Sequence, residues 1–168
     1  MRLQAASEHF DIPVFEHTPG SFKMVFGKAS EFLVDPVKGG TDSLPVENTR
    51  FFKLKKKILI YNPTLSHYEY NEIRAIDQNI LQLKDPLAHS YPPNSTIIML
   101  KTIEYKLYTH QNILKRKIDR GYFQPLIEQV SEFYVTFFPE SNSVLYKLEI
   151  SHREQVRGYI FLSNRVQK

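Results

Sequence analysis

Apolar and polar residues alternate over several short stretches of the chain, which is the pattern of half-buried β-strands. The clearest stretch is residues 97–109, in which Ile103, Tyr105 and Leu107 share one face. Further strands are predicted over residues 72–77, 80–83, 144–150 and 156–162. We expect the apolar faces of the strands to form the core and to bury Ile103, Tyr105, Leu107, Leu148 and Ile150.

Proline and glycine interrupt this alternation most densely in residues 35–45, which contain Pro36, Gly39, Gly40 and Pro45. A segment of this composition is typical of a loop. We therefore place a domain boundary at its end. Residues 1–44 are interpreted as an N-terminal appendage of short strands and loop, and residues 45–168 as a β-barrel-like domain.

One segment has helical spacing. Pro125 suits the first turn of a helix, and Pro139 would end it. The apolar residues that fall near one face between them are Leu126, Val130, Phe133 and Phe137. We predict a helix over residues 124–138. The expected fold class is mainly β, with six or seven antiparallel strands in a small barrel or strongly bent sheet and one helix in the C-terminal half.

The composition excludes several kinds of chemistry. The 168 residues include no cysteine, which rules out disulfides, thiolate zinc sites and cysteine nucleophiles. The six histidines have no spacing that places two on one face of a helix or strand, so we predict neither a metal site nor a cofactor. The N-terminal residues lack the apolar core of a signal peptide, and no apolar run is long enough to span a membrane. A cytoplasmic location is expected.

A Glu-x-Lys pattern on the best predicted strand is one candidate for catalysis. Many metal-dependent nucleases place an acidic residue before such a strand, where the carboxylates hold the metal ion and the lysine orients water. Here Asp85 precedes Glu104 and Lys106. The alternative is that Glu104 and Lys106 simply form the wet face of an amphipathic strand.

Basic residues interleaved with apolar ones form two clusters, at residues 53–57 and 115–120. Such a mixture can contact phosphates and stack on bases, and the net charge of +4 favours anionic partners. The first cluster predicts a nucleic-acid contact through Lys53, Lys55, Lys56 and Lys57. The alternative is an ordinary solvated surface.

Arg153 and Arg157 form an Arg-x-x-x-Arg pair just before residues 159–162 of the last predicted strand. Two guanidinium groups at this spacing can hold one phosphate-rich ligand, because each planar fork binds phosphate or a guanine edge through two hydrogen bonds.

The order of these features resembles the N-terminal module of bacterial flagellar-brake proteins and the start of their PilZ domain, over about residues 50–162. The resemblance implies that Arg153 and Arg157 bind cyclic di-GMP. The second PilZ motif, Asp/Asn-x-Ser-x-x-Gly, is absent.

Three functional classes follow. The first is a non-enzymatic bacterial binding or regulatory module, as part of a cyclic-di-GMP effector. The second is a nucleic-acid-binding protein, with a metal-dependent nuclease that uses Asp85, Glu104 and Lys106 as its enzymatic version. The third is a domain that binds a protein partner through an exposed sheet edge.

Overall fold

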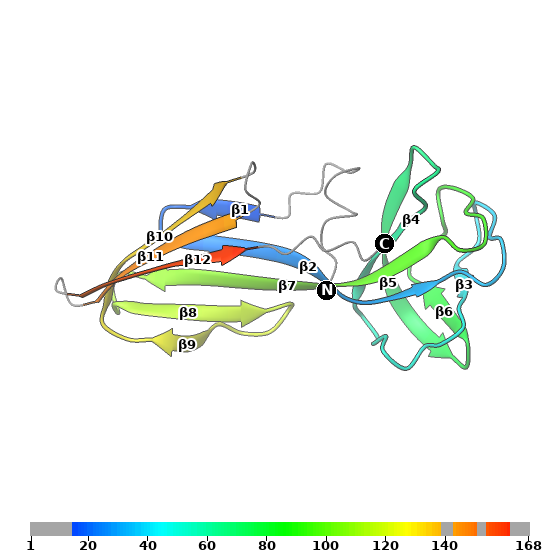
Figure 1. The fold of residues 1–168 in the computed structure, drawn as a ribbon. Helices are drawn as coiled ribbons and strands as arrows, with labels where there is room; N and C mark the ends of the chain where they lie inside the picture. The colour runs from blue at the N-terminus through cyan, green and yellow to red at the C-terminus, as the bar shows by residue number, and fades with distance from the viewer. Residues whose placement is uncertain (1–14, 139–142, 151–153, 162–168) are drawn as a thin grey trace. The chain divides into compact units, whose positions relative to one another are not determined.

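The computed structural model describes residues 15–138, 143–150 and 154–161. Within these residues the chain forms β-strands and no helix (Figure 1). In chain order the strands are β1 (Phe15–Thr18), β2 (Ser21–Phe32), β3 (Ser43–Pro45), β4 (Lys57–Tyr61), β5 (Tyr68–Asp77), β6 (Ile80–Leu83), β7 (Thr96–Tyr108), β8 (Ile113–Ile118), β9 (Gln124–Ile127), β10 (Val130–Phe138), β11 (Ser143–Ile150) and β12 (Glu154–Phe161). In this part of the chain there is no helix long and apolar enough to cross a membrane.

The chain divides into two compact units. Unit 1 is drawn from residues 1–26 and 102–168, and unit 2 consists of residues 27–101. The divisions fall inside β2 and inside β7, so each of these strands contributes to both units. The boundary predicted after residue 44 falls inside β3, within unit 2.

Unit 2 is built around β4, which pairs with a strand on each side and whose residues 58–61 are all buried. The register sets Ile60 opposite Ile97 of β7 and opposite Glu69 of β5. β5 also pairs with β6, and β6 pairs with β3; both pairings are antiparallel. The strands predicted over residues 72–77 and 80–83 are confirmed and pair as a hairpin, whose bend places Gln78 at a φ of 42°. The core of unit 2 contains Leu33, Val37, Leu44, Val46, Phe52, Ile58, Ile60, Ile73, Leu81, Leu83, Leu87, Tyr91, Ile97 and Met99.

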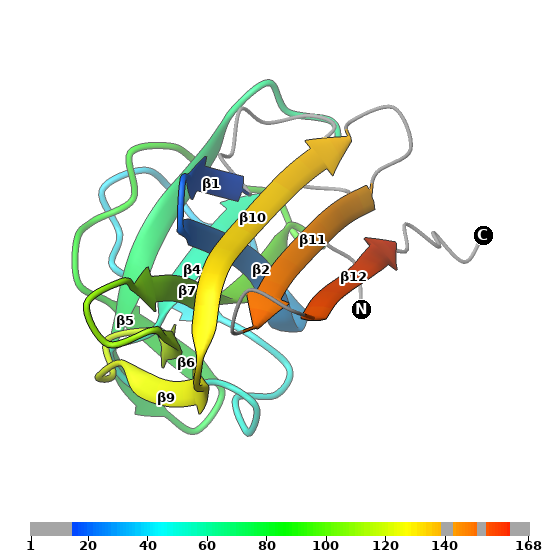
Figure 2. The same ribbon diagram turned by 90° about the vertical axis from the view of Figure 1, so that its left-hand side faces the viewer.

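Unit 1 contains two antiparallel sheets. One has the order β1-β2-β7 and continues to β8 and β9 (Figure 1), and the other is β10-β11-β12 (Figure 2). Both sheets supply its core, which consists of Phe22, Leu107, Leu114, Val130, Phe133, Val144 and Leu148. Leu107 and Leu148 are buried as predicted, whereas Ile103, Tyr105 and Ile150 are half-buried.

The prediction of a mainly β, antiparallel fold is confirmed, but its finer details are wrong. The sheets of the described residues do not close into a barrel, because each has unpaired edge strands: β1, β3 and β9 in one sheet, and β10 and β12 in the other. The part of the chain that the structure describes forms twelve strands, where six or seven were expected. Strands of three or four residues, such as β3 and β9, are too short to show an alternating pattern in the sequence.

The helix predicted over residues 124–138 is also wrong, since β9 and β10 occupy this segment. A bulge between Val130 and Glu132 allows Val130 and Phe133, three residues apart, to reach the same core. The core residues on either side of the bulge therefore have the three-residue spacing that is typical of one face of a helix. Residues 133–138 are all aromatic or β-branched, which favours a strand.

Candidate polyanion-binding surfaces

A group of lysine and aromatic side chains covers part of the first sheet of unit 1. We call it the aromatic–lysine face and define it by Lys106, Tyr108, Lys115, Lys117 and Phe123. The β7–β8 register sets Lys106 opposite Lys115, and Leu107 opposite Leu114. Because Leu107 and Leu114 point into the core, the alternation of the strands turns Lys106 and Lys115 to the opposite face.

The lysines of this face lie over the aromatic rings. The Lys115 Nζ is 4.1 Å from the centroid of the Tyr108 ring, and the Lys106 Nζ is 5.8 Å from the same ring. The Lys117 Nζ is 4.8 Å from the centroid of Phe123. The Tyr108 and Phe123 rings meet edge to face with their centroids 5.7 Å apart. Each cation–π contact at the protein surface contributes about 0.5–1 kcal/mol.

The turn after β8 positions Phe123. Asp119 holds this turn against β7, because its carboxylate accepts a 2.8 Å hydrogen bond from the Thr102 N–H, while its own N–H donates to the Thr102 carbonyl. Asp119 has a φ of 51°, in the left-handed region that aspartate tolerates better than most residues. Tyr122, beside Phe123, is 93% exposed. The turn therefore presents aromatic residues beside the lysines of β8.

The Glu-x-Lys pattern lies on this strand. The Glu104 carboxylate forms a 2.7 Å ion pair with the Lys117 Nζ across the strands, while Lys106 lies near Tyr108. Asp85 belongs to unit 2, where its backbone exchanges hydrogen bonds with the Asn71 side chain. Among the residues that the structure describes, no group of three or more acidic or histidine side chains could hold a metal ion. The nuclease hypothesis stays a prediction.

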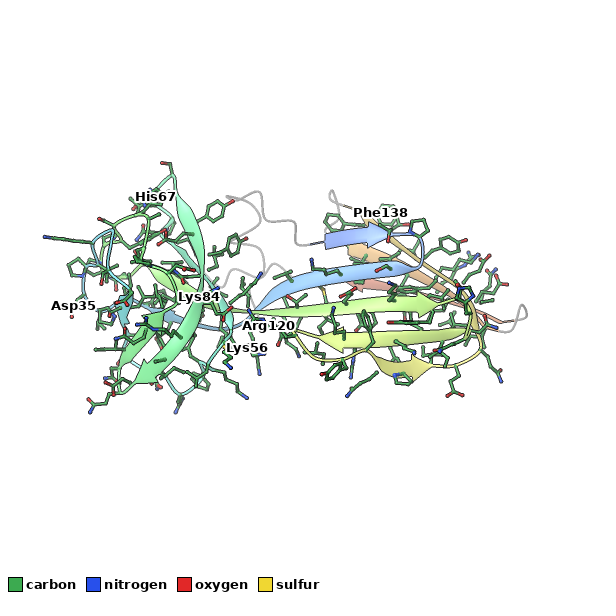
Figure 3. The ribbon with its side chains drawn as sticks, turned by 180° about the vertical axis from the view of Figure 1, so that it is seen from behind. Asp35, Lys56, His67, Lys84, Arg120 and Phe138 are labelled. Carbon is green, nitrogen blue, oxygen red and sulfur yellow. The ribbon has the colours of Figure 1, made fainter. Side chains whose placement is uncertain are left out.

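The basic segment of unit 2 forms a loop that leads into β4 and includes its first residue, Lys57. We call residues 50–57 the basic loop; it contains Arg50, Lys53, Lys55, Lys56 and Lys57 and no acidic residue (Figure 3 labels Lys56). Two apolar side chains among these cations are exposed, Phe51 by 50% and Leu54 by 55%. The Arg50 guanidinium lies over the Phe51 ring, 4.3 Å from its centroid.

The basic loop is fixed to the body of unit 2. Phe52 is buried in the core, and its N–H donates to the Thr49 carbonyl. The Lys55 N–H donates to the carbonyl of Ile73, and the Ile73 N–H donates to the carbonyl of Lys56. Lys55 has a φ of 60°, a conformation that costs a non-glycine residue roughly 1 kcal/mol. The exposed side chains thus extend from a backbone of defined shape.

The structure describes only one of the two arginines of the Arg-x-x-x-Arg pair. Arg153 lies outside the described residues. Arg157 lies within β12, opposite Lys147 of β11, and is exposed. Its Nη2 donates a 2.8 Å hydrogen bond to the Gln155 Oε1. Binding of cyclic di-GMP by Arg153 and Arg157 therefore stays a prediction.

A cluster that the sequence pattern did not indicate lies in unit 2 and consists of His67, Glu69, His89 and Tyr91. The two imidazole rings lie 4.3 Å apart, and the His67 ring meets the Tyr91 ring edge to face at 5.3 Å (Figure 3 labels His67). The buried Glu69 Oε1 and Tyr91 Oη make no hydrogen bond within the described part of the chain. No local spacing could have revealed this cluster, because its members come together only when the segment after β6 returns beside β5.

The partial burial of Glu69 predicts that the stability of the fold depends on pH. Burial raises the pKa of its carboxyl, partly opposed by the hydrogen bond from the Ala88 N–H and by the charges of His89 and His67. A carboxyl with a raised pKa binds its proton more tightly in the folded state, so its contribution to stability falls as the pH rises above its usual pKa of 4.5. Glu69→Gln is therefore expected to raise the melting temperature at pH 7 and to have little effect below pH 4.5.

This prediction is checked by thermal unfolding of the variant and the native chain across the pH range. Glu47→Gln, at an exposed position of the same unit, is the matched control. An equal effect of Glu69→Gln at all pH values would contradict a raised pKa for the Glu69 carboxyl.

Comparison with known proteins gives little further guidance. No protein-family model matches the chain, and the comparison with curated proteins found no significant match. Among solved structures, the Gp54 tailspike of Acinetobacter baumannii bacteriophage AP22, in complex with A. baumannii capsular saccharide, is similar over 46% of this chain and 15% of the tailspike chain. The identity is 14% and the TM-score 0.39. A likeness of this size establishes neither a common fold nor a common function.

Proposed function

We propose that the chain is a non-enzymatic binding module whose aromatic–lysine face binds single-stranded nucleic acid. The observation that supports this most directly is the alternation of Lys106, Lys115 and Lys117 with the rings of Tyr108 and Phe123 on one sheet face. Single strands offer a charged backbone and flat bases at short intervals. A sheet that presents both cations and aromatic rings matches the two features together.

The charge balance of the face favours an anionic ligand. Glu104 neutralises Lys117, while Lys106 and Lys115 lie beside Tyr108. When a base stacks on Tyr108, Lys115 moves from the ring to a neighbouring phosphate. The cation–π contact given up is about 0.5–1 kcal/mol, whereas stacking of a base on an aromatic side chain contributes about 1–3 kcal/mol. The exchange therefore favours binding.

The test is fluorescence anisotropy with a labelled single-stranded oligonucleotide at several salt concentrations. The double variant Lys106→Gln with Lys115→Gln is expected to weaken binding about tenfold and to reduce the slope of log affinity against log salt by about 1.4, since each phosphate contact on a single strand contributes about 0.7. Phe123→Ala is expected to weaken binding about tenfold, at the lower end of a lost stacking contact.

Lys28→Gln with Lys38→Gln is the control for net charge, because both lysines are exposed and lie in unit 2. Equal losses in the two double variants would mean that overall charge, and not this face, attracts the strand. Salt-insensitive binding, or none, would remove the proposal. Cleavage of the oligonucleotide with magnesium, abolished by Glu104→Ala, would favour the nuclease hypothesis instead.

A further inference from the structure

A second surface, in unit 2, has a different combination of side chains. In the basic loop, Leu54 stands between Lys53 and Lys55, and Phe51 follows Arg50. More than half of Leu54 is exposed, although the same unit buries six of its other leucines, at 33, 44, 59, 81, 83 and 87. We propose that the basic loop docks on an anionic lipid surface, with Phe51 and Leu54 inserted among the lipids. This inference does not depend on the proposed function of unit 1.

Apolar side chains surrounded by cations suit the boundary between lipid headgroups and acyl chains. The apolar groups leave water, while the basic groups stay at the level of the anionic headgroups. The long lysine side chains can reach back to the headgroups when the backbone approaches them. Both elements occur here within eight residues that contain no carboxylate.

The details of the loop favour lipid over nucleic acid. Leu54 is aliphatic and offers no aromatic plane on which a base could stack. The Arg50 guanidinium covers one face of the Phe51 ring, which limits stacking there. The ring edge and the leucine methyl groups are suited to insertion. Because Phe52 and the backbone hydrogen bonds of Lys55 and Lys56 fix the loop, little conformational entropy is lost on docking.

The chain provides a clear spectroscopic test, since it contains no tryptophan. Leu54→Trp introduces a single indole at the proposed insertion site, and Leu126→Trp introduces one at an exposed leucine of unit 1. Vesicles of phosphatidylcholine with phosphatidylserine are expected to shift the Leu54→Trp emission to shorter wavelength and to leave the Leu126→Trp emission unchanged. Vesicles of phosphatidylcholine alone are expected to shift neither.

Vesicle cosedimentation then measures separately what the lysine charges and the inserted leucine contribute to binding. Lys53→Gln with Lys55→Gln is expected to lower the partition coefficient about thirtyfold, which corresponds to about 1 kcal/mol for each basic residue near an anionic surface. Leu54→Ser keeps the charge and is expected to lower it about tenfold, as for partial burial of a leucine side chain. Lys28→Gln with Lys38→Gln is the control for net charge, and melting temperatures confirm that each variant is folded.

Four results would overturn the proposal, and the first three come from the vesicle experiments. They are no binding to phosphatidylserine vesicles, binding that Leu54→Ser leaves unchanged, and a shift in the Leu126→Trp emission equal to that of Leu54→Trp. Loss of oligonucleotide binding by Lys53→Gln with Lys55→Gln, without loss of vesicle binding, would also overturn it. That last result would identify Lys53, Lys55, Lys56 and Lys57 as the nucleic-acid contact that their sequence predicts.

Discussion

Truncation of Leu107 to alanine is expected to lower the free energy of unfolding by about 2–5 kcal/mol. Leu107 is 8% exposed and lies in the core of unit 1 with Leu114 and Phe133. The substitution removes apolar contacts and leaves a cavity that a close-packed sheet fills only in part. Denaturant unfolding followed by circular dichroism measures the change.

Leu126→Ala is the matched control for this prediction. Leu126 is also a strand residue of unit 1, in β9, but it is 45% exposed. Its truncation is expected to change stability by less than about 0.5 kcal/mol, as for most surface substitutions. If both variants lost similar stability, Leu107 would not occupy the core and the assignment of faces on β7 would be reversed.

The second large effect is expected at Gly158, where an added methyl group has no space. In the β11–β12 register Gly158 stands opposite Tyr146, whose ring lies over the glycine. A Cβ atom at residue 158 would come within 2.6 Å of the Tyr146 Cε1, far inside van der Waals contact. Gly158→Ala therefore displaces a ring that packs against the core of unit 1, at a cost of about 1–3 kcal/mol.

A double-mutant cycle isolates this clash from other effects of the substitution. Gly158→Ala is expected to be far less destabilising in a Tyr146→Ala background, because the ring that it displaces is then absent. The thermal stability of the four chains gives the coupling energy. Additive effects of the two substitutions would show that the cost at residue 158 does not come from Tyr146.

Long alternating stretches of sequence predicted their strands well. Residues 97–109 and 144–150 closely match β7 and β11, and the strands predicted over residues 72–77 and 80–83 match the second half of β5 and the whole of β6. Alternation identifies a strand when one face is buried and the stretch is long enough to repeat. The helix prediction failed because Val130 and Phe133 are brought to one core by a bulge, which local spacing cannot distinguish from a helical turn.

The candidate surfaces were predictable only in part. The sequence shows that Lys115 and Lys117 lie two residues apart, and that Lys53, Lys55, Lys56 and Lys57 lie close together. It does not show that Lys115 lies opposite Lys106, or that the turn after β8 brings Phe123 beneath Lys117. These are consequences of strand register, which non-local pairing determines.

The cluster of His67, Glu69, His89 and Tyr91 likewise depends on non-local pairing and could not be predicted from the sequence. His67 and His89 belong to segments separated by a whole hairpin, and each alone is an unremarkable polar residue. Their rings meet because the chain after β6 returns to form the bridge between Val37 and Tyr91. Sequence analysis can propose such a pair only when the path of the intervening chain is known.

The division of β2 and β7 between the two units constrains the order of events during synthesis. A ribosome makes the first strands of unit 1, then all of unit 2, and only then the strands that complete the core of unit 1. Phe22 therefore cannot contact Leu107 and Leu148 until the whole of residues 27–101 has emerged from the ribosome. Unit 2 is continuous in sequence and needs no later residue for its core, so the middle of this chain can fold before its beginning.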